Sequence, residues 1–173
     1  LTVDFGLYRP LSIGNRVWID ANNNGIFDNG ENPVPDGVTL TLYEDDGTTP
    51  IDDPTNPGNP YQVSTINGYY LFENLLPGDY IVELDSSNFA TNNDPLFGYS
   101  SSDDGGAGYQ DGDTNNDRND NGSDTTTPAT DGIPSGVISL TYNTEPENEE
   151  TSGLPRDGIS GRGNNNELDN NSD

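Results

Sequence analysis

The chain has 173 residues, of which 28% are hydrophobic, and its 31 acidic residues against five arginines give a net charge of −26. This charge disfavours nucleic acids and anionic membranes as partners, because both would be repelled. For a chain of this length we expect one domain with large loops. Cys, His, Met and Lys are absent. We therefore expect no disulfide, and no enzymatic activity, because the usual pairs of nucleophile and base cannot form.

The first candidate strand is Leu1–Tyr8, which ends at Arg9-Pro10. Apolar and mostly polar residues alternate along it, as is typical of a half-buried strand. The apolar positions are Leu1, Val3, Phe5 and Leu7.

Further runs of apolar, aromatic and β-branched residues predict six more strands, separated by turns rich in Asn, Asp, Gly and Pro. They are Leu11–Ile19, Val38–Tyr43, Tyr61–Thr65, Tyr69–Glu73, Asp79–Leu84 and Gly136–Tyr142. Asn67-Gly68 predicts a type I′ hairpin turn, and no amphipathic helix is expected. About seven short strands predict an all-β fold, an antiparallel immunoglobulin-like β-sandwich. The expected core comprises Trp18, Tyr70, Phe72, Tyr80, Val82 and Leu84.

The loop between the first two of these six strands, residues 20–31, has the ligand spacing of a calcium-binding EF-hand loop. Side-chain oxygens occupy loop positions 1, 3, 5, 9 and 12, and a backbone carbonyl is expected from position 7: Asp20, Asn22, Asn24, Asp28, Glu31 and Ile26. Gly25 allows the sharp turn in the middle of the loop. Prolines follow closely, so EF-hand helices are excluded, and the alternative is a surface turn that binds nothing.

A second acidic segment, residues 103–124, favours one or two more calcium sites. The candidate ligands are Asp111, Asp113, Asn115, Asp117, Asn119, Asn121 and Asp124. This segment lacks the closing Glu of the first loop, so a carboxylate from elsewhere would have to complete the shell. The alternative is a solvated, flexible acidic loop.

The stretch from Gly68 to Val82 follows the pattern G-x-Y-x-F-x-x-L-x-P-G-x-Y-x-V. Together with the Gly14–Asp20 stretch and the calcium loop, it resembles the B repeats of serine–aspartate-repeat surface adhesins, which are collagen-adhesin B-type, prealbumin-like sandwiches. The resemblance covers roughly residues 11–145. It implies a bacterial surface stalk or fibre module that is rigidified by two or three Ca²⁺ ions.

An extracellular location, at a cell surface or in a secreted filament, is expected on two further grounds. Asn at two of the first three side-chain ligand positions suits millimolar calcium, and a small core without disulfides would need a metal brace. No signal peptide and no run long enough to span a bilayer is present. Many relatives form a Lys–Asn isopeptide crosslink, which a chain without Lys cannot form.

In the related repeats, a segment like Leu1–Tyr8 is the closing strand of a domain. We therefore expect residues 1–10 to be a strand that closes a neighbouring or preceding unit, 11–145 to be the sandwich, and 146–173 to be a polar tail. The segment could act in trans by donor-strand exchange between copies joined head to tail. It could also act in cis, or simply link tandem repeats.

Two functions remain open at this point: a structural fibre module, and an adhesin module that binds a carbohydrate or a protein. Exposed aromatic side chains at Phe97, Tyr99 and Tyr109 would favour adhesion, whereas their burial would favour structure.

Overall fold

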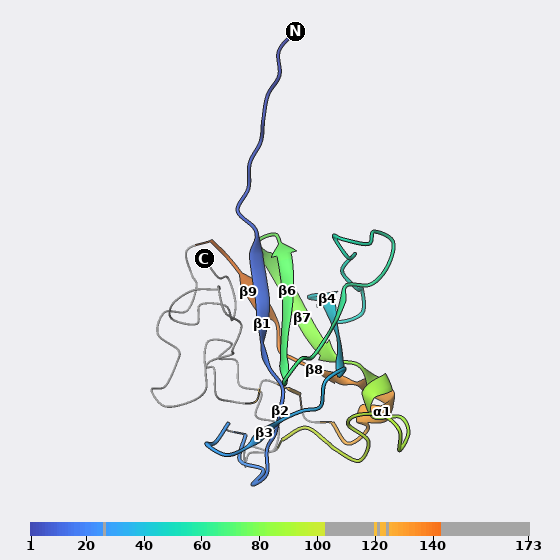
Figure 1. The fold of residues 1–173 in the computed structure, drawn as a ribbon. Coiled ribbons are helices and arrows are strands. Elements are labelled where there is room, and N and C mark those ends of the chain that lie inside the picture. The colour runs from blue at the N-terminus through green and yellow to red at the C-terminus, as the bar shows by residue number, and fades with distance from the viewer. Residues whose placement is uncertain (26, 103–119, 121, 124, 143–173) are drawn as a thin grey trace.

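The computed structural model describes residues 1–25, 27–102, 120, 122–123 and 125–142. Within them, nine strands build an all-β fold (Figure 1). The strands are β1 (Leu11–Arg16), β2 (Trp18–Ile19), β3 (Asn32–Pro33), β4 (Thr39–Glu44), β5 (Gln62–Ser64), β6 (Tyr69–Leu75), β7 (Gly78–Leu84), β8 (Ile133–Pro134) and β9 (Ile138–Leu140).

All of the strand pairs are antiparallel. A two-stranded sheet joins β1 to β6, and a five-stranded sheet runs β5-β4-β7-β8, with β9 also pairing with β7. The short strands β2 and β3 form a third, two-stranded sheet. The predicted antiparallel sandwich is therefore confirmed, with two more short strands than expected.

The main core lies between the two larger sheets. It contains Leu11 and Ile13 from β1, Phe72 and Leu75 from β6, and Leu40, Leu42, Tyr61, Tyr80, Val82 and Leu140 facing them. A second cluster, which lies mostly outside the strands, comprises Val34, Val38, Phe89, Leu96 and Ile133. Val17 and Leu84 pack against both clusters.

Three of the six residues predicted for the core are buried: Phe72, Tyr80 and Val82. The prediction is wrong in degree for Trp18, Tyr70 and Leu84, which are only half-buried. The physical reason is that these three side chains line a cavity beside the core.

The type I′ turn at Asn67-Gly68 is confirmed. Asn67 has φ 53° and Gly68 has φ 83°, as this turn requires at both central residues. The flanking residues Ile66 and Tyr69 exchange two backbone hydrogen bonds of 2.9 and 3.0 Å. This turn connects β5 of the five-stranded sheet to β6 of the β1–β6 sheet.

Residues 1–10 form no strand in this structure, contrary to the prediction for Leu1–Tyr8. They extend away from the domain, at the end opposite the β2–β3 pair (Figure 1). The alternating apolar side chains are exposed, with Val3 at 75% and Phe5 at 88%. The segment therefore does not fill its own domain, and the described part of the chain supplies no partner strand for it.

Helix is nearly absent from the described residues. There is one four-residue α-helix, α1 (Pro128–Asp131), and one short 3₁₀ helix, Ser86–Asn88. None of the described helices has the length and apolarity needed to cross a membrane. The predicted tail, residues 146–173, lies outside the described residues.

Candidate metal loop and adjoining cavity

An aromatic cluster holds the 20–31 loop against the end of β1. The Phe27 ring packs edge-on against Trp18 at 5.8 Å between centroids. The Arg16 guanidinium lies 4.6 Å from the centre of the same ring and 5.5 Å from that of Tyr69. Phe27 is only 8% exposed, so this apolar position within a polar loop anchors the loop to the sandwich.

Hydrogen bonds fold the loop back on itself. The Asp20 carboxylate accepts bonds from the backbone N–H groups of Asn22, Asn23 and Gly25, at 3.1, 2.6 and 2.8 Å. Glu31 accepts bonds from the backbone N–H groups of Ala21 and Asp28, at 2.8 and 2.9 Å. The residues at loop positions 1 and 12 thus both turn inward onto the loop backbone.

The middle of the loop is gathered around Asp28. The side-chain amides of Asn22 and Asn24 donate to the same Asp28 oxygen, at 3.0 and 3.1 Å. The structure therefore brings five of the six predicted ligand residues of this loop into one hydrogen-bonded arrangement. To hold a cation, the two Asn side chains must present their oxygens in place of their amide nitrogens.

Burial and hydrogen bonds both act on the pKa of the Asp20 carboxyl. Partial burial raises the pKa of this carboxyl, but hydrogen bonds from Ser102 and from three backbone N–H groups outweigh burial and hold the pKa below its ordinary value. Asp20 is therefore ionised at neutral pH. The carboxylates of Asp20, Asp28 and Glu31 offer oxygen ligands of the kind that calcium prefers.

Within the described ranges, no group of three or more acidic side chains is close enough together to form a metal cluster. The sixth predicted ligand, Ile26, lies outside the described residues. So do all seven candidates of the second acidic segment: Asp111, Asp113, Asn115, Asp117, Asn119, Asn121 and Asp124.

One acidic residue next to the loop was missed by sequence reasoning. The backbone N–H of Asp120 donates a 2.7 Å hydrogen bond to the carbonyl of Gly25. The Asp120 side chain accepts from Ser101 at 3.2 Å, and Ser102 donates to Asp20. Asp120 lies between the candidate ligands Asn119 and Asn121 of the second acidic segment, at a position that their alternation skips, so ligand spacing alone could not single it out.

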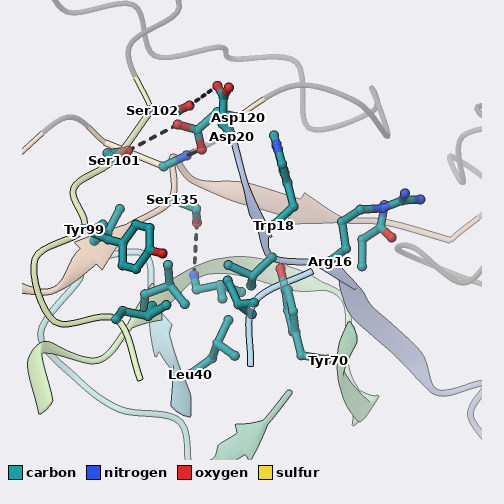
Figure 2. Close-up of a pocket in the computed structure, with 18 of the residues that line it drawn as sticks. Arg16, Trp18, Asp20, Leu40, Tyr70, Tyr99, Ser101, Ser102, Asp120 and Ser135 are labelled. Carbon is teal, nitrogen blue, oxygen red and sulfur yellow. Dashed lines mark hydrogen bonds between the residues drawn. The ribbon is translucent and has the colours of Figure 1, made fainter. Parts of the chain in front are cut away.

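A cavity of about 240 Å³ opens beside the loop. Figure 2 shows Asp20, Ser101, Ser102 and Asp120 gathered at one side of it, whereas Leu40 and Tyr70 lie at another side. Burial raises the pKa of Tyr70 to about 12, so its hydroxyl stays protonated. The cavity therefore has an apolar side and a polar side, and the candidate metal loop helps to form the polar side.

Comparison with known proteins gives a consistent result. A model of the SdrD B-like domain family matches residues 11–131. Colossin-A of Dictyostelium discoideum is 41% identical over 80 residues, which is 44% of this chain and 1% of that protein.

Two staphylococcal proteins are similar over about half of the chain. The serine-aspartate repeat-containing protein I of Staphylococcus saprophyticus is 37% identical over 91 residues, covering 49% of this chain and 4% of that protein. The fibrinogen-binding protein of Staphylococcus epidermidis is 35% identical over 97 residues, covering 53% of this chain and 8% of that protein. The chain thus spans only a small part of each of these relatives.

Proposed function

Because the chain belongs to the SdrD B-like domain family, we propose that it is an extracellular, non-catalytic structural module of a surface stalk or filament. It is related to a domain of serine–aspartate-repeat adhesins. In this role, calcium stiffens the sandwich, and residues 1–8 join one copy to the next.

The calcium part of the proposal is supported by the 20–31 loop. Its five described candidate ligands converge by hydrogen bonding, and Phe27 anchors them to β1 and β2. Bound calcium would supply positive charge and a fixed loop geometry, and Asp20 and Glu31 would hold the ion from the two ends of the loop. An ion that binds only the folded chain would stabilise the thin core by mass action.

The observation that carries the joining role is the apolar stripe of the N-terminal segment. Leu1, Val3, Phe5 and Leu7 are all at least 75% exposed, although they alternate as in a half-buried strand. Burying four such side chains contributes about 6–12 kcal/mol before ordering costs. A head-to-tail contact of this kind repeats without closing, so it produces a linear chain of copies.

The joining role is tested by a charge placed in the stripe of the full chain. In calcium, we expect the wild-type chain to form beaded filaments by electron microscopy, and Phe5→Asp to remain monomeric by sedimentation. Thr2→Asp is the matched control, because Thr2 projects to the opposite face of an extended strand. It should assemble like the wild type.

The melting temperature of the monomer should be unchanged in Phe5→Asp, since Phe5 is 88% exposed. A wild-type chain that stays monomeric at high concentration, or a Phe5→Asp variant that still forms filaments, would rule out this mode of joining.

A second function is favoured by two aromatic side chains. Phe97 is 52% exposed and Tyr99 is 49% exposed, and exposed aromatic residues are enriched among the energetically important residues of binding surfaces. The third predicted aromatic residue, Tyr109, lies outside the described residues. This surface would serve an adhesin module that binds a protein or carbohydrate.

Fibrinogen is the probe for this alternative, because one relative is named a fibrinogen-binding protein. We would measure surface plasmon resonance of the wild type, of Phe97→Ser and of Tyr99→Ser. Binding that falls at least about tenfold in both variants, equivalent to about 1.4 kcal/mol, would support adhesion. Binding that is absent, or that is unaffected by both changes, would remove fibrinogen as the ligand of this surface.

A further inference from the structure

We propose that the cavity beside β1 is the acceptor site for residues 1–8 of a second copy of this chain. This inference rests on the proposed joining role and adds the place where the joining strand sits. The cavity is lined by Ile13 to Asp20 on one side and by residues of β4, β7, β8 and β9 on the other. It therefore lies between the two main layers of the sandwich.

The cavity coincides with a gap in the hydrophobic core. Ile13 and Val82 belong to the first core cluster, and Phe89 and Ile133 belong to the second. All four of these residues line the cavity, which therefore borders both clusters. An apolar cavity of about 150 Å³ already holds a benzene ring, so 240 Å³ has room for the Phe5 ring and part of an aliphatic side chain.

In the part of the chain that the structure describes, the layer beside the cavity has two strands. Among the described residues, β1 pairs with β6 at one edge and with no strand at the other. A two-stranded sheet is marginal by itself, and a third strand gives such a layer independent stability. An incoming strand along β1 would extend the sheet and direct alternate side chains into the cavity.

The length of the segment suits this position. Eight extended residues span about 26 Å, and the Leu11–Ile19 strip spans about 30 Å, at about 3.3 Å per residue. The segment also carries little charge, because Asp4 is the one charged side chain in residues 1–8, whereas the chain has a net charge of −26. It is therefore one part of the chain that approaches an acidic copy without strong repulsion.

The segment cannot reach the same place in its own domain by a tight turn. Only Arg9-Pro10 separates it from β1, and a two-residue hairpin needs a positive φ at its first central residue. A residue before proline is restricted to extended conformations, and proline itself is fixed near φ −65°. The segment accordingly points away from its domain (Figure 1).

Trp18 gives an independent indication of a missing polar partner. Its indole nitrogen is buried and has no hydrogen-bond partner among the described residues, although Trp18 lines the cavity (Figure 2). A buried donor without an acceptor is unfavourable. A backbone carbonyl of a strand lying along β1 would supply that acceptor.

The absence of cysteine makes this position testable by disulfide trapping in the full chain. The double variant Phe5→Cys/Ile138→Cys places one thiol on the segment and one in the cavity, because Ile138 of β9 lines the cavity. Its control is Phe5→Cys/Val137→Cys, because Val137 precedes Ile138, is 51% exposed and does not line the cavity. A disulfide forms only between residues whose Cβ atoms lie about 4 Å apart. A second set of double variants therefore carries Val3→Cys in place of Phe5→Cys, so that a segment bound two residues further along β1 is also detected.

Under mild oxidation of calcium-grown filaments, we expect the Ile138→Cys pairings to give a ladder of covalent oligomers on denaturing gels, and the Val137→Cys pairings to give none. Both double variants should first show filaments equal to those of the wild type under reducing conditions. Filaments with no ladder, or with equal ladders from both cysteines, would overturn the cavity as acceptor and leave the proposed joining intact.

A disulfide closed within one chain would place the segment in its own domain and would also overturn the inference. Absence of filaments from the wild type itself would instead overturn the joining role, and this inference with it.

Discussion

Glu31 is the residue on which the candidate metal loop most depends. Its two carboxylate oxygens accept hydrogen bonds from Ala21 and Asp28, so one side chain connects the start of the loop to its end. Position 12 of a calcium loop is the place where a single Glu can supply both oxygens to the ion. The same geometry therefore serves the folded loop alone and the loop with a cation.

We predict that Glu31→Gln reduces the stabilisation by calcium while changing stability in chelator little. Gln keeps an oxygen that can accept a hydrogen bond but loses the charge and the bidentate carboxylate. At a calcium concentration of 100 times Kd, the wild type gains about 2.7 kcal/mol, and the variant should gain much less. The measurement is the melting temperature by circular dichroism, with and without calcium.

The control for this variant is Asp45→Asn, which removes one acidic charge in the turn after β4, outside the loop. It should respond to calcium like the wild type. If Glu31→Gln and the wild type respond to calcium equally, the ion is not held by this loop.

At the residue scale, ligand spacing predicted which side chains of the 20–31 loop lie together, because those contacts are local. Asp120 and Ser102 could not be predicted in this way. Asp120 reaches Gly25 across 95 residues of sequence, and Ser102 reaches Asp20 across 82. No local pattern contains such contacts.

The turn at Asn67-Gly68, between β5 and β6, lies close to the β2–β3 pair. A side chain added at Gly68 would place its Cβ 2.6 Å from Cβ of Pro33 in β3 and 2.8 Å from the carbonyl oxygen of Val17. The backbone N–H of Val17 in turn donates to the carbonyl of Gly68 at 2.7 Å. The hairpin turn therefore packs directly against the β2–β3 pair, which flanks the candidate metal loop.

We predict that Gly68→Ala destabilises the fold by more than about 1 kcal/mol, because it adds steric overlap to the cost of a positive φ. Gly58→Ala is the matched control, since Gly58 has φ 90° and open space around its Cβ position. Urea unfolding should give a clearly lower midpoint for Gly68→Ala than for Gly58→Ala. Equal midpoints would show that the approach of Pro33 carries no energetic weight.

Element prediction was most accurate for the longest strands, β6 and β7. The predicted Tyr69–Glu73 and Asp79–Leu84 strands became β6 and β7 with small changes at their ends. β8 was missed because it has only two residues, one of them Pro134, and exists through pairing with Glu83 and Leu84 of β7. Such a strand is a product of tertiary contact, which local propensity does not contain.

At the scale of the whole molecule, composition alone would have suggested disorder, since 28% hydrophobic content and a net charge of −26 are both unfavourable for a compact state. The fold nevertheless forms because its apolar residues are concentrated in strands and in two buried clusters. The predicted family is confirmed by the match over residues 11–131. The alternating sequence pattern predicted a filled sandwich with Trp18, Tyr70 and Leu84 in its core. In a single chain these three side chains instead line an open cavity.

The direct passage from residues 1–10 into β1 also has a mechanical consequence. No flexible linker separates them, and Pro10 limits rotation at the junction. A pulling force applied to the segment therefore enters the domain along the axis of β1, parallel to its antiparallel pairing with β6 from Leu11 to Arg16. In that direction the hydrogen bonds of the pair are loaded in shear and share the load together, instead of opening one after another from an end. A module of this design resists tension along the line of a stalk better than it resists peeling from the side.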